Sequence, residues 1–130
     1  MNQKIAHIAL VVKDYDEAID FYVNKLNFDL IEDTVLGKDK RWVLVSPKGT
    51  DNCSLLLAKA ANELQKSHIG NQAGGRVFLF LYTDNFERDY RNLIDKEITI
   101  VRETKDEVYG IVAVFKDLYG NQWDLIQPKK

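Results

Sequence analysis

Two side chains near opposite ends of the chain could bind a ligand or transfer a proton. His7 lies in an otherwise apolar run, and Asp124 is flanked by Trp123 and Leu125. An unpaired carboxylate among apolar neighbours loses much of its hydration energy, so Asp124 needs a partner. That partner is a metal ion, His7, a backbone amide or water. The two side chains could also form an acid/base pair in which the carboxylate orients the imidazole. A core role for His7, hydrogen-bonded to a neighbour, stays open.

Aromatic residues are candidates for the walls of a small-molecule site, because aromatic faces commonly line such sites. Each could equally belong to an ordinary core. Trp42 follows a lysine and an arginine, and Arg76 lies beside the Gly74-Gly75 pair, so a cation could meet an anionic or oxygen-rich ligand at either place. A solvated surface role is the alternative for Arg76. The aromatic candidates are Trp42, Tyr109, Phe115 and Trp123, and we take Trp42, Arg76 and Phe115 as candidate substrate-binding residues.

Other reactive residue types carry no recognisable motif. The single cysteine, Cys53, excludes an internal disulfide and a cysteine-based zinc cluster. His68 lies in a polar stretch, where a histidine needs no functional explanation. Neither a glycine-rich nucleotide fingerprint nor a nucleophile elbow occurs. Any chemistry therefore depends on the few residues above.

The first half of the chain predicts a strand, a helix and three more strands. Residues 5–12 are mostly apolar on both alternating faces, which is typical of a strand covered on both sides. Asp14 and Glu17 have the spacing of a helix capping box. Apolar residues then recur at intervals of three and four as a helical stripe. The stripe consists of Tyr15, Ala18, Ile19, Tyr22 and Leu26, and the following strands are expected at 28–32, 41–46 and 54–59, with a turn at 47–52.

The second half repeats this order after a connector at 60–75 that could hold a short helix. A strand is expected at 76–83, and Asp84 and Glu87 form a second capping box. A second helical stripe follows, and strands are expected at 99–103, 111–116 and 122–126. The stripe consists of Phe86, Tyr90, Leu93 and Ile94.

The two halves of the sequence align at a constant difference in residue number, which changes only in the last strand. Adding 70 to the residue number maps His7 to Val77 and Asp14 to Asp84 with no gap, and a shorter offset of 68 aligns Leu56 with Asp124. Two copies indicate duplication inside a domain, because a solenoid needs at least three repeats. We predict a single α+β domain, 1–130, with pseudo-repeats at about 5–59 and 76–127.

Composition narrows the function classes. A chain of 130 residues with 45% apolar residues suits one globular domain. The 18 basic and 20 acidic residues are mixed along the chain, which disfavours nucleic acid and membrane surfaces as partners. The apolar run at 5–12 is too short to span a bilayer. We expect a cytoplasmic protein and, from the exposed edges of paired sheets, a homodimer.

Three segments resemble the vicinal oxygen chelate superfamily, which groups glyoxalase I, bleomycin-resistance proteins and extradiol dioxygenases. They are HIALVVKDYDEAIDFYVNKLNF, GGRVFLFLYTDNFERDY and VFKDLYGNQWDLIQP, and together they extend across nearly the whole chain. The resemblance implies two tandem βαβββ units that form a curved mixed sheet around a cleft, often completed in a dimer.

The same resemblance implies a divalent metal, Zn, Ni, Mn or Fe, held by residues of the first, fourth, fifth and eighth strands. Those positions fall on His7, Leu56, Val77 and Asp124. Only His7 and Asp124 can donate a lone pair, whereas enzymatic sites typically use three protein donors. We expect these two residues to be the metal ligands or the catalytic residues.

The resemblance therefore implies a glyoxalase/bleomycin resistance/dioxygenase-like protein that acts on or binds a small oxygenated molecule. A metal-dependent lyase or dioxygenase is one expectation, in which the cation polarises two substrate oxygens. A metal-free, drug-sequestering binding protein is the alternative, which the incomplete ligand set favours. A metal-free enzyme that uses His7 and Asp124 is the third hypothesis.

Overall fold

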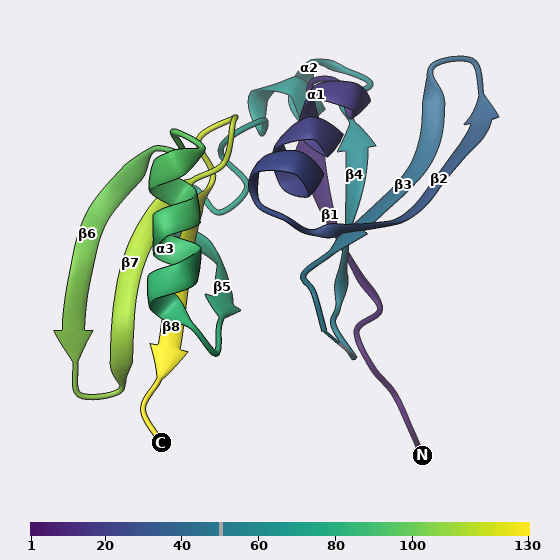
Figure 1. Cartoon of the computed structure of the whole chain (residues 1–130). Coiled ribbons are helices and arrows are strands. Elements are labelled where there is room, and N and C mark those ends of the chain that lie inside the picture. The colour runs from purple at the N-terminus through teal and green to yellow at the C-terminus, as the bar shows by residue number, and fades with distance from the viewer. Residues whose placement is uncertain (50) are drawn as a thin grey trace. The chain divides into compact units, whose positions relative to one another are not determined.

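The computed structural model describes residues 1–49 and 51–130, and residue 50, in the predicted turn 47–52, lies outside the described residues. The chain divides into two compact units, which we call unit 1 (residues 1–69) and unit 2 (residues 70–130). Each unit has one four-stranded mixed sheet with a helix packed against it (Figure 1). The units are described separately below.

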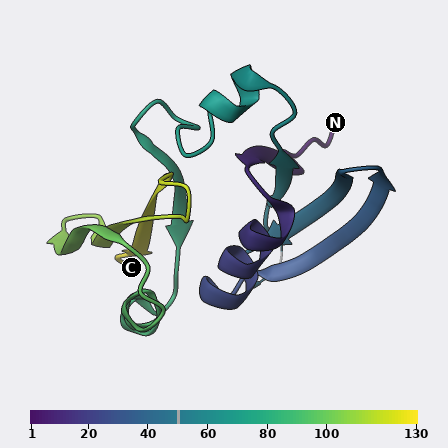
Figure 2. The same ribbon diagram turned by 90° about the horizontal axis from the view of Figure 1, so that it is seen from above.

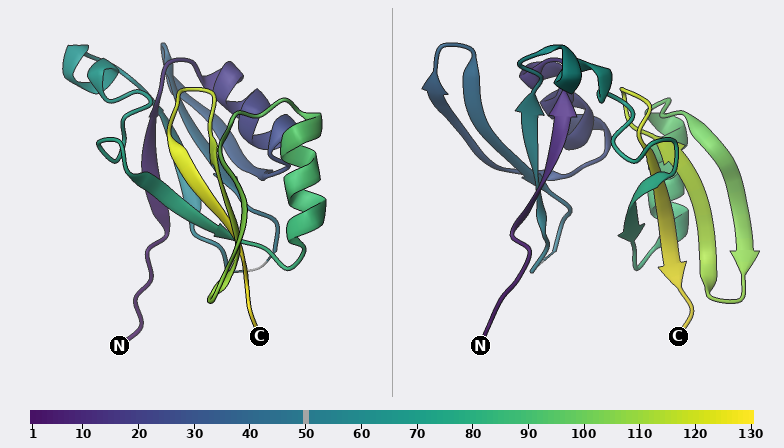
Figure 3. Two further views of the ribbon diagram at one scale, coloured as in Figure 1. Left: turned by 90° about the vertical axis from the view of Figure 1, so that its left-hand side faces the viewer. Right: turned by 180° about the vertical axis from the view of Figure 1, so that it is seen from behind.

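Unit 1 contains β1 (His7–Val12), α1 (Tyr15–Ile19), the π-helical segment η1 (Asp20–Lys25), β2 (Asp29–Gly37), β3 (Lys40–Ser46), β4 (Ser54–Lys59) and α2 (Glu63–Ser67). The strand order is β1-β4-β3-β2. β1 is parallel to β4, and the right-hand view of Figure 3 shows the two strands side by side. The other two pairs, β4 with β3 and β3 with β2, are antiparallel.

The core of unit 1 lies between its sheet and the first helix. α1 contacts β3 and β4. Alternate residues of three strands point to this side and are completely buried, because side chains in a strand alternate between faces. These residues are Leu10, Val12, Val43, Val45 and Leu57, and Tyr22 of η1 is equally buried. Removal of this apolar surface from water stabilises unit 1.

Unit 2 repeats the plan. It contains β5 (Val77–Tyr82), α3 (Phe86–Asp95), β6 (Ile100–Glu107), β7 (Gly110–Lys116) and β8 (Gln122–Pro128) in the order β5-β8-β7-β6. Figure 2 shows α3 end-on, to one side of its sheet. The core on the α3 side contains Leu93, Ala113, Phe115, Trp123 and Leu125, none of them more than 3% exposed. The predicted α+β fold with a strand, a helix and three strands in each repeat is confirmed.

The expectation of a gapless repeat is wrong in detail. The register between β5 and β8 shifts between Val77 and Leu79, which adds one residue to unit 2 before its helix. The helix of unit 1 then continues into η1, and a π-helical segment holds about one residue more than the same length of α-helix. The two additions cancel. Asn27 and Glu97, which both have a positive φ and follow the helices, are therefore again 70 residues apart.

The second capping box is consequently displaced by one residue. The cap of α3 is Asn85, whose side chain accepts a hydrogen bond from the backbone of Arg88 at 3.0 Å. Asp84 instead accepts from the side chain of Arg88 at 3.2 Å. The first cap is Asp14, as predicted, and it accepts from the backbone of Glu17 at 2.9 Å. Asparagine and aspartate cap helices about equally well. The residue type therefore does not distinguish Asn85 from Asp84, and the spacing of Asp84 and Glu87 predicts the wrong cap.

The strands β2 and β6 are longer than expected. The sequence predicts strands at 28–32 and 99–103, but β2 ends at Gly37 and β6 ends at Glu107. All nine residues of β2 are exposed, so the hydrophobic alternation that marks a half-buried strand is absent there. The short helix expected in the connector is α2. Among the described helices, none is long and apolar enough to cross a membrane.

Candidate functional site

His7 and Trp42 lie together on the face of the unit 1 sheet that is turned away from α1. The register pairs Ala9 with Leu56 and Leu56 with Leu44, so alternate residues of three strands share this face. The rings of His7 and Trp42 are 6.0 Å apart and meet edge to face. We call this surface the open face of unit 1, and it consists of His7, Ala9, Trp42, Leu44 and Leu56. Two of the sequence-predicted site residues are thus neighbours.

Arg41, beside Trp42, points to the opposite side of the sheet. Its guanidinium lies 5.2 Å from the centre of the Tyr15 ring and forms ion pairs with Asp16 at 2.9 Å and Asp33 at 2.6 Å. The hydrogen bond from Arg41 lowers the pKa of Asp33. The hydrogen bond to Asp33, with a second to Asp16, raises the pKa of Arg41. Arg41 therefore ties the β2–β3 hairpin to α1 and is not available for an anionic ligand on the open face.

Asp124 occupies a row of side chains on the face of the unit 2 sheet that is turned away from α3. The register pairs it with Phe80 of β5 and Val114 of β7, and Val114 with Arg102 of β6. Phe80 is 62% exposed, and Tyr82, two residues along β5, is 69% exposed. We call this surface the open face of unit 2, and it consists of Phe80, Tyr82, Arg102, Val114 and Asp124.

Burial raises the pKa of Asp124, and the positive charge of Arg102 acts in the opposite direction. The open face of unit 2 therefore joins exposed aromatic surface to one carboxyl group and one guanidinium. A carboxylate accepts hydrogen bonds and a guanidinium donates them, so the pair can bind a ligand that has both hydroxyl and carbonyl oxygens.

The other predicted substrate-binding residues lie elsewhere. Phe115 is completely buried on the α3 side, where its ring stacks on Trp123 at 6.0 Å. Arg76 is exposed just before β5, and Tyr109 is 60% exposed at the β6–β7 turn. Phe115 and Trp123 are thus core residues of unit 2 and present no exposed ring to its open face.

The residues at the metal positions do not form a set of donors. Leu56 lies on the open face of unit 1 and Val77 begins β5, and neither has a lone pair to donate. His7 belongs to unit 1 and Asp124 to unit 2. Across residues 1–49 and 51–130, no three side chains of His, Cys, Asp or Glu gather as a metal site. With lone-pair donors at only two of these four positions, the residues there do not fit a divalent metal bound by protein donors alone.

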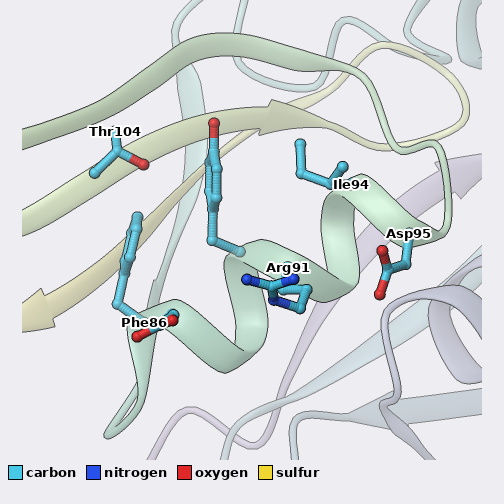
Figure 4. A pocket seen from close by; sticks show the side chains of 7 residues that line it. Phe86, Arg91, Ile94, Asp95 and Thr104 are labelled. Atoms are coloured by element: carbon cyan, nitrogen blue, oxygen red, sulfur yellow. The ribbon is translucent and has the colours of Figure 1, made fainter.

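A separate hollow of about 420 Å³ lies in unit 2 between α3 and β6 (Figure 4). Its lining residues are Phe86, Glu87, Tyr90, Arg91, Ile94, Asp95 and Thr104. The rings of Phe86 and Tyr90 stack 5.5 Å apart along α3. The sequence predicts that Phe86, Tyr90 and Ile94 belong to one helical stripe, and in the structure Ile94 of that stripe is 52% exposed.

Phe80, Tyr82 and Arg102 are not among the site residues that the sequence predicts. The signal for the first two was the apolar run at 76–83, in which alternate aromatic residues share one face once the register is known. Arg102 fell inside the predicted strand at 99–103, but only its pairing through Val114 places it in the row of Asp124.

Comparison with known proteins supplies the family context. The model of the Glyoxalase/Bleomycin resistance protein/Dioxygenase superfamily matches residues 4–125. An uncharacterised protein of Shewanella frigidimarina is 64% identical over 128 residues, which cover 98% of this chain and 95% of that protein.

Two solved structures are similar over nearly the full length. The structure of UcmS2 has a TM-score of 0.83 at 29% identity. The match covers 97% of this chain and 98% of the UcmS2 chain. TnmS3, an antibiotic binding protein from Streptomyces sp. CB03234, has a TM-score of 0.78 at 30% identity and covers 98% of both chains.

Proposed function

Because the chain belongs to the glyoxalase/bleomycin resistance protein/dioxygenase superfamily, we propose that it binds a small molecule without a resident metal. The observation that carries the proposal is that Leu56 and Val77 stand where the family has metal donors, while Phe80 and Tyr82 are exposed on the open face of unit 2. A binding protein needs an apolar surface with a few directed polar groups, and it needs no activated water.

The side chains of each open face, taken separately, indicate the chemistry of a ligand that could bind there. Trp42 and His7 on unit 1, and Phe80 and Tyr82 on unit 2, offer flat apolar contact to a ring system. Asp124 and Arg102 add one acceptor and one donor. We infer an aromatic ligand with hydroxyl and carbonyl oxygens. The similarity to TnmS3, an antibiotic binding protein, supports an antibiotic of this type as the ligand class.

Binding measured with and without chelator tests this proposal. Purified protein is titrated with doxorubicin and with bleomycin A2 by isothermal calorimetry, first in EDTA and then with Zn²⁺, Ni²⁺, Mn²⁺ or Fe²⁺. We expect saturable binding of at least one compound with the same Kd in every condition. Binding that needs the metal, or no binding of either compound, contradicts the proposal.

Matched variants assign the binding surface. Trp42→Ala removes a half-buried ring from the open face of unit 1, and Phe80→Ala removes an exposed ring from the open face of unit 2. In the variant whose face binds the ligand, the Kd should rise about tenfold, a loss of about 1.4 kcal/mol. Leu64→Ala is the control, because Leu64 is a 71% exposed apolar residue of α2 outside both open faces. Equal loss in all three variants would contradict the assignment.

A second candidate function is metal-free acid/base catalysis by His7 and Asp124. The raised pKa of Asp124 favours it, because a carboxyl group whose pKa lies closer to neutral is a better proton donor. Asp124→Asn distinguishes the two functions. Under simple binding, an uncharged amide still forms hydrogen bonds and ligand affinity is largely kept, whereas any turnover of a bound compound should be abolished.

We also propose that the protein is a homodimer. Within its own sheet, β1 pairs with β4 alone and β5 with β8 alone, so each leaves one edge of backbone donors and acceptors for another strand. Light scattering after size-exclusion chromatography tests the proposal. A mass near 30 kDa, twice the 15.0 kDa of the chain, is expected, and a monomer mass at 100 µM protein would contradict it.

A further inference from the structure

The hollow between α3 and β6 lies on the helix side of the unit 2 sheet, apart from the open face. Figure 4 shows Phe86 and Ile94 rising from α3 on the side of Thr104, with Arg91 and Asp95 along the neighbouring side of the helix. A register shift in β6 accompanies this arrangement, because Glu103 and Thr104 together lie opposite Ala113 of β7. Bulges of this kind re-aim side chains and are common next to binding sites.

The corresponding place in unit 1 is filled by the protein itself. Tyr15 is the first residue of α1, and the guanidinium of Arg41 lies over its ring. Asp16, the second residue of α1, and Asp33 of β2 pair with that guanidinium. Unit 1 therefore holds an internal cation between an aromatic ring and two carboxylates.

Unit 2 keeps the aromatic ring and a carboxylate but has no cation at the position that corresponds to Arg41. Phe86 and Glu87 are the first two residues of α3, as Tyr15 and Asp16 are of α1. Arg41 is the second residue of β3, and the second residue of β7 is Ile111. The guanidinium is thus replaced by an aliphatic side chain, and Phe86 and Glu87, which correspond to Tyr15 and Asp16, line the hollow.

The charges around the hollow also favour a cation. Glu87 and Asp95 are one turn on either side of Arg91, which leaves the lining with one net negative charge. None of these three side chains takes part in an ion pair or a hydrogen bond in the described parts of unit 2. The stacked rings of Phe86 and Tyr90 add aromatic surface, which attracts cations through the ring quadrupole.

We propose that this hollow is a second binding site, for an organic cation in which a guanidinium or ammonium group is carried on an apolar body. The cationic group pairs with Glu87, as Arg41 pairs with Asp16, and the apolar body lies against Phe86, Tyr90 and Ile94. The volume of about 420 Å³ is within the range of small-molecule sites.

The test uses benzylguanidinium as the probe and the full chain labelled with ¹⁵N. A titration followed by amide chemical shifts should perturb residues 86–95 and 103–105 in a saturable way. N-benzylurea has nearly the same shape without the charge, and it should bind about tenfold more weakly. Equal binding of the two compounds, or shifts confined to other residues at 20 mM probe, would overturn the proposal.

Two variants locate the charge. Glu87→Gln should reduce the affinity for benzylguanidinium about fivefold and leave that for N-benzylurea unchanged. Asp84→Asn is the matched control, because Asp84 is an exposed acid before α3 that pairs with Arg88 outside the hollow. Equal affinity of Glu87→Gln and the wild type would overturn the role of Glu87.

A third variant copies the arrangement of unit 1. Ile111→Arg places a guanidinium at the position that corresponds to Arg41, so it should fill the hollow and abolish probe binding. Far-UV circular dichroism and the amide spectrum confirm that the variant is folded. A folded Ile111→Arg variant that binds the probe with unchanged affinity would overturn the proposed correspondence between the units.

Discussion

Replacing Arg41 with methionine should destabilise unit 1 and remove a specific dependence of its stability on pH. Methionine keeps the length and apolar volume of the side chain but loses the charge. Three interactions disappear: the ion pair with Asp33, the ion pair with Asp16 and the contact with the Tyr15 ring. The hydrogen bond from the Arg41 backbone to the Tyr15 hydroxyl, 3.1 Å long, does not depend on the side chain and is kept.

The size of the effect follows from exposure. Arg41 and Asp33 are only 24% and 28% exposed, and two hydrogen bonds join them, so this pair contributes about 1 kcal/mol. Asp16 is 81% exposed, so the ion pair between Arg41 and Asp16 contributes only about a few tenths of a kcal/mol. The contact with Tyr15 adds about 0.5–1 kcal/mol. The free energy of unfolding should therefore fall by about 2 kcal/mol at pH 7.

The pH dependence follows from the lowered pKa of Asp33. A carboxyl group whose pKa is lower in the folded state stabilises the fold above its unfolded pKa, about 3.9, and this stability is lost as the pH falls through the folded pKa. The difference between wild type and Arg41→Met should shrink below about pH 4. Urea unfolding followed by tryptophan fluorescence at pH 7 and at pH 3 measures it.

Lys48→Met is the control for this experiment. Lys48 also pairs with an aspartate of β2, Asp29, but the two side chains are 67% and 50% exposed. Its loss should cost less than about 0.5 kcal/mol. The reasoning is refuted if the two variants lose equal stability, or if the loss in Arg41→Met is the same at both pH values.

Three further predictions concern unit 2. Phe115→Ala should cost about 3–5 kcal/mol of stability in thermal or urea unfolding, because Phe115 is fully buried, and a normal melting temperature would contradict that core position. Asp124→Asn should raise stability at pH 7 but not below about pH 3.9, since burial penalises the charged carboxylate, and lower stability at pH 7 would count against this. Glu97→Gly should stabilise the fold by about 0.5–1 kcal/mol, because Glu97 has a φ of 57°, and the melting temperature measures the gain.

The fold was largely predictable because its signals are local and occur twice. Two apolar strands, each followed by an acidic or amide cap and a helical stripe, indicate the repeat before any coordinates are known. The register shift after Val77 and the π-helical segment Asp20–Lys25 were not predictable, because their effects on residue numbering cancel. The alignment of the two halves is therefore continuous in the sequence, and it predicts Asp84 as the cap in place of Asn85.

The candidate site was less predictable, because strands β5 and β7 of unit 2 are apolar on both faces. In β7 the residues Val114 and Phe115 are both buried, so composition does not reveal which of them faces α3. The aromatic residue was assigned to a ligand site, yet it is the one that stacks on Trp123 in the core. The row of Phe80, Asp124 and Arg102 depends on register across three strand pairs, and that information is not local.

The paired irregularities in β5 and η1 set a rule for protein engineers who would recombine the two halves. Between those two points, equivalent residues are 71 apart, whereas the spacing is 70 just before them, at His7, and just after them, at Asn27. If two halves are joined inside that interval at a spacing of 70, the helix of the hybrid protein is shifted by one residue relative to its strand. Each residue of an α-helix turns about 100°, so this shift would rotate the apolar stripe away from the sheet. Junctions placed in the hairpins or in the connector avoid it.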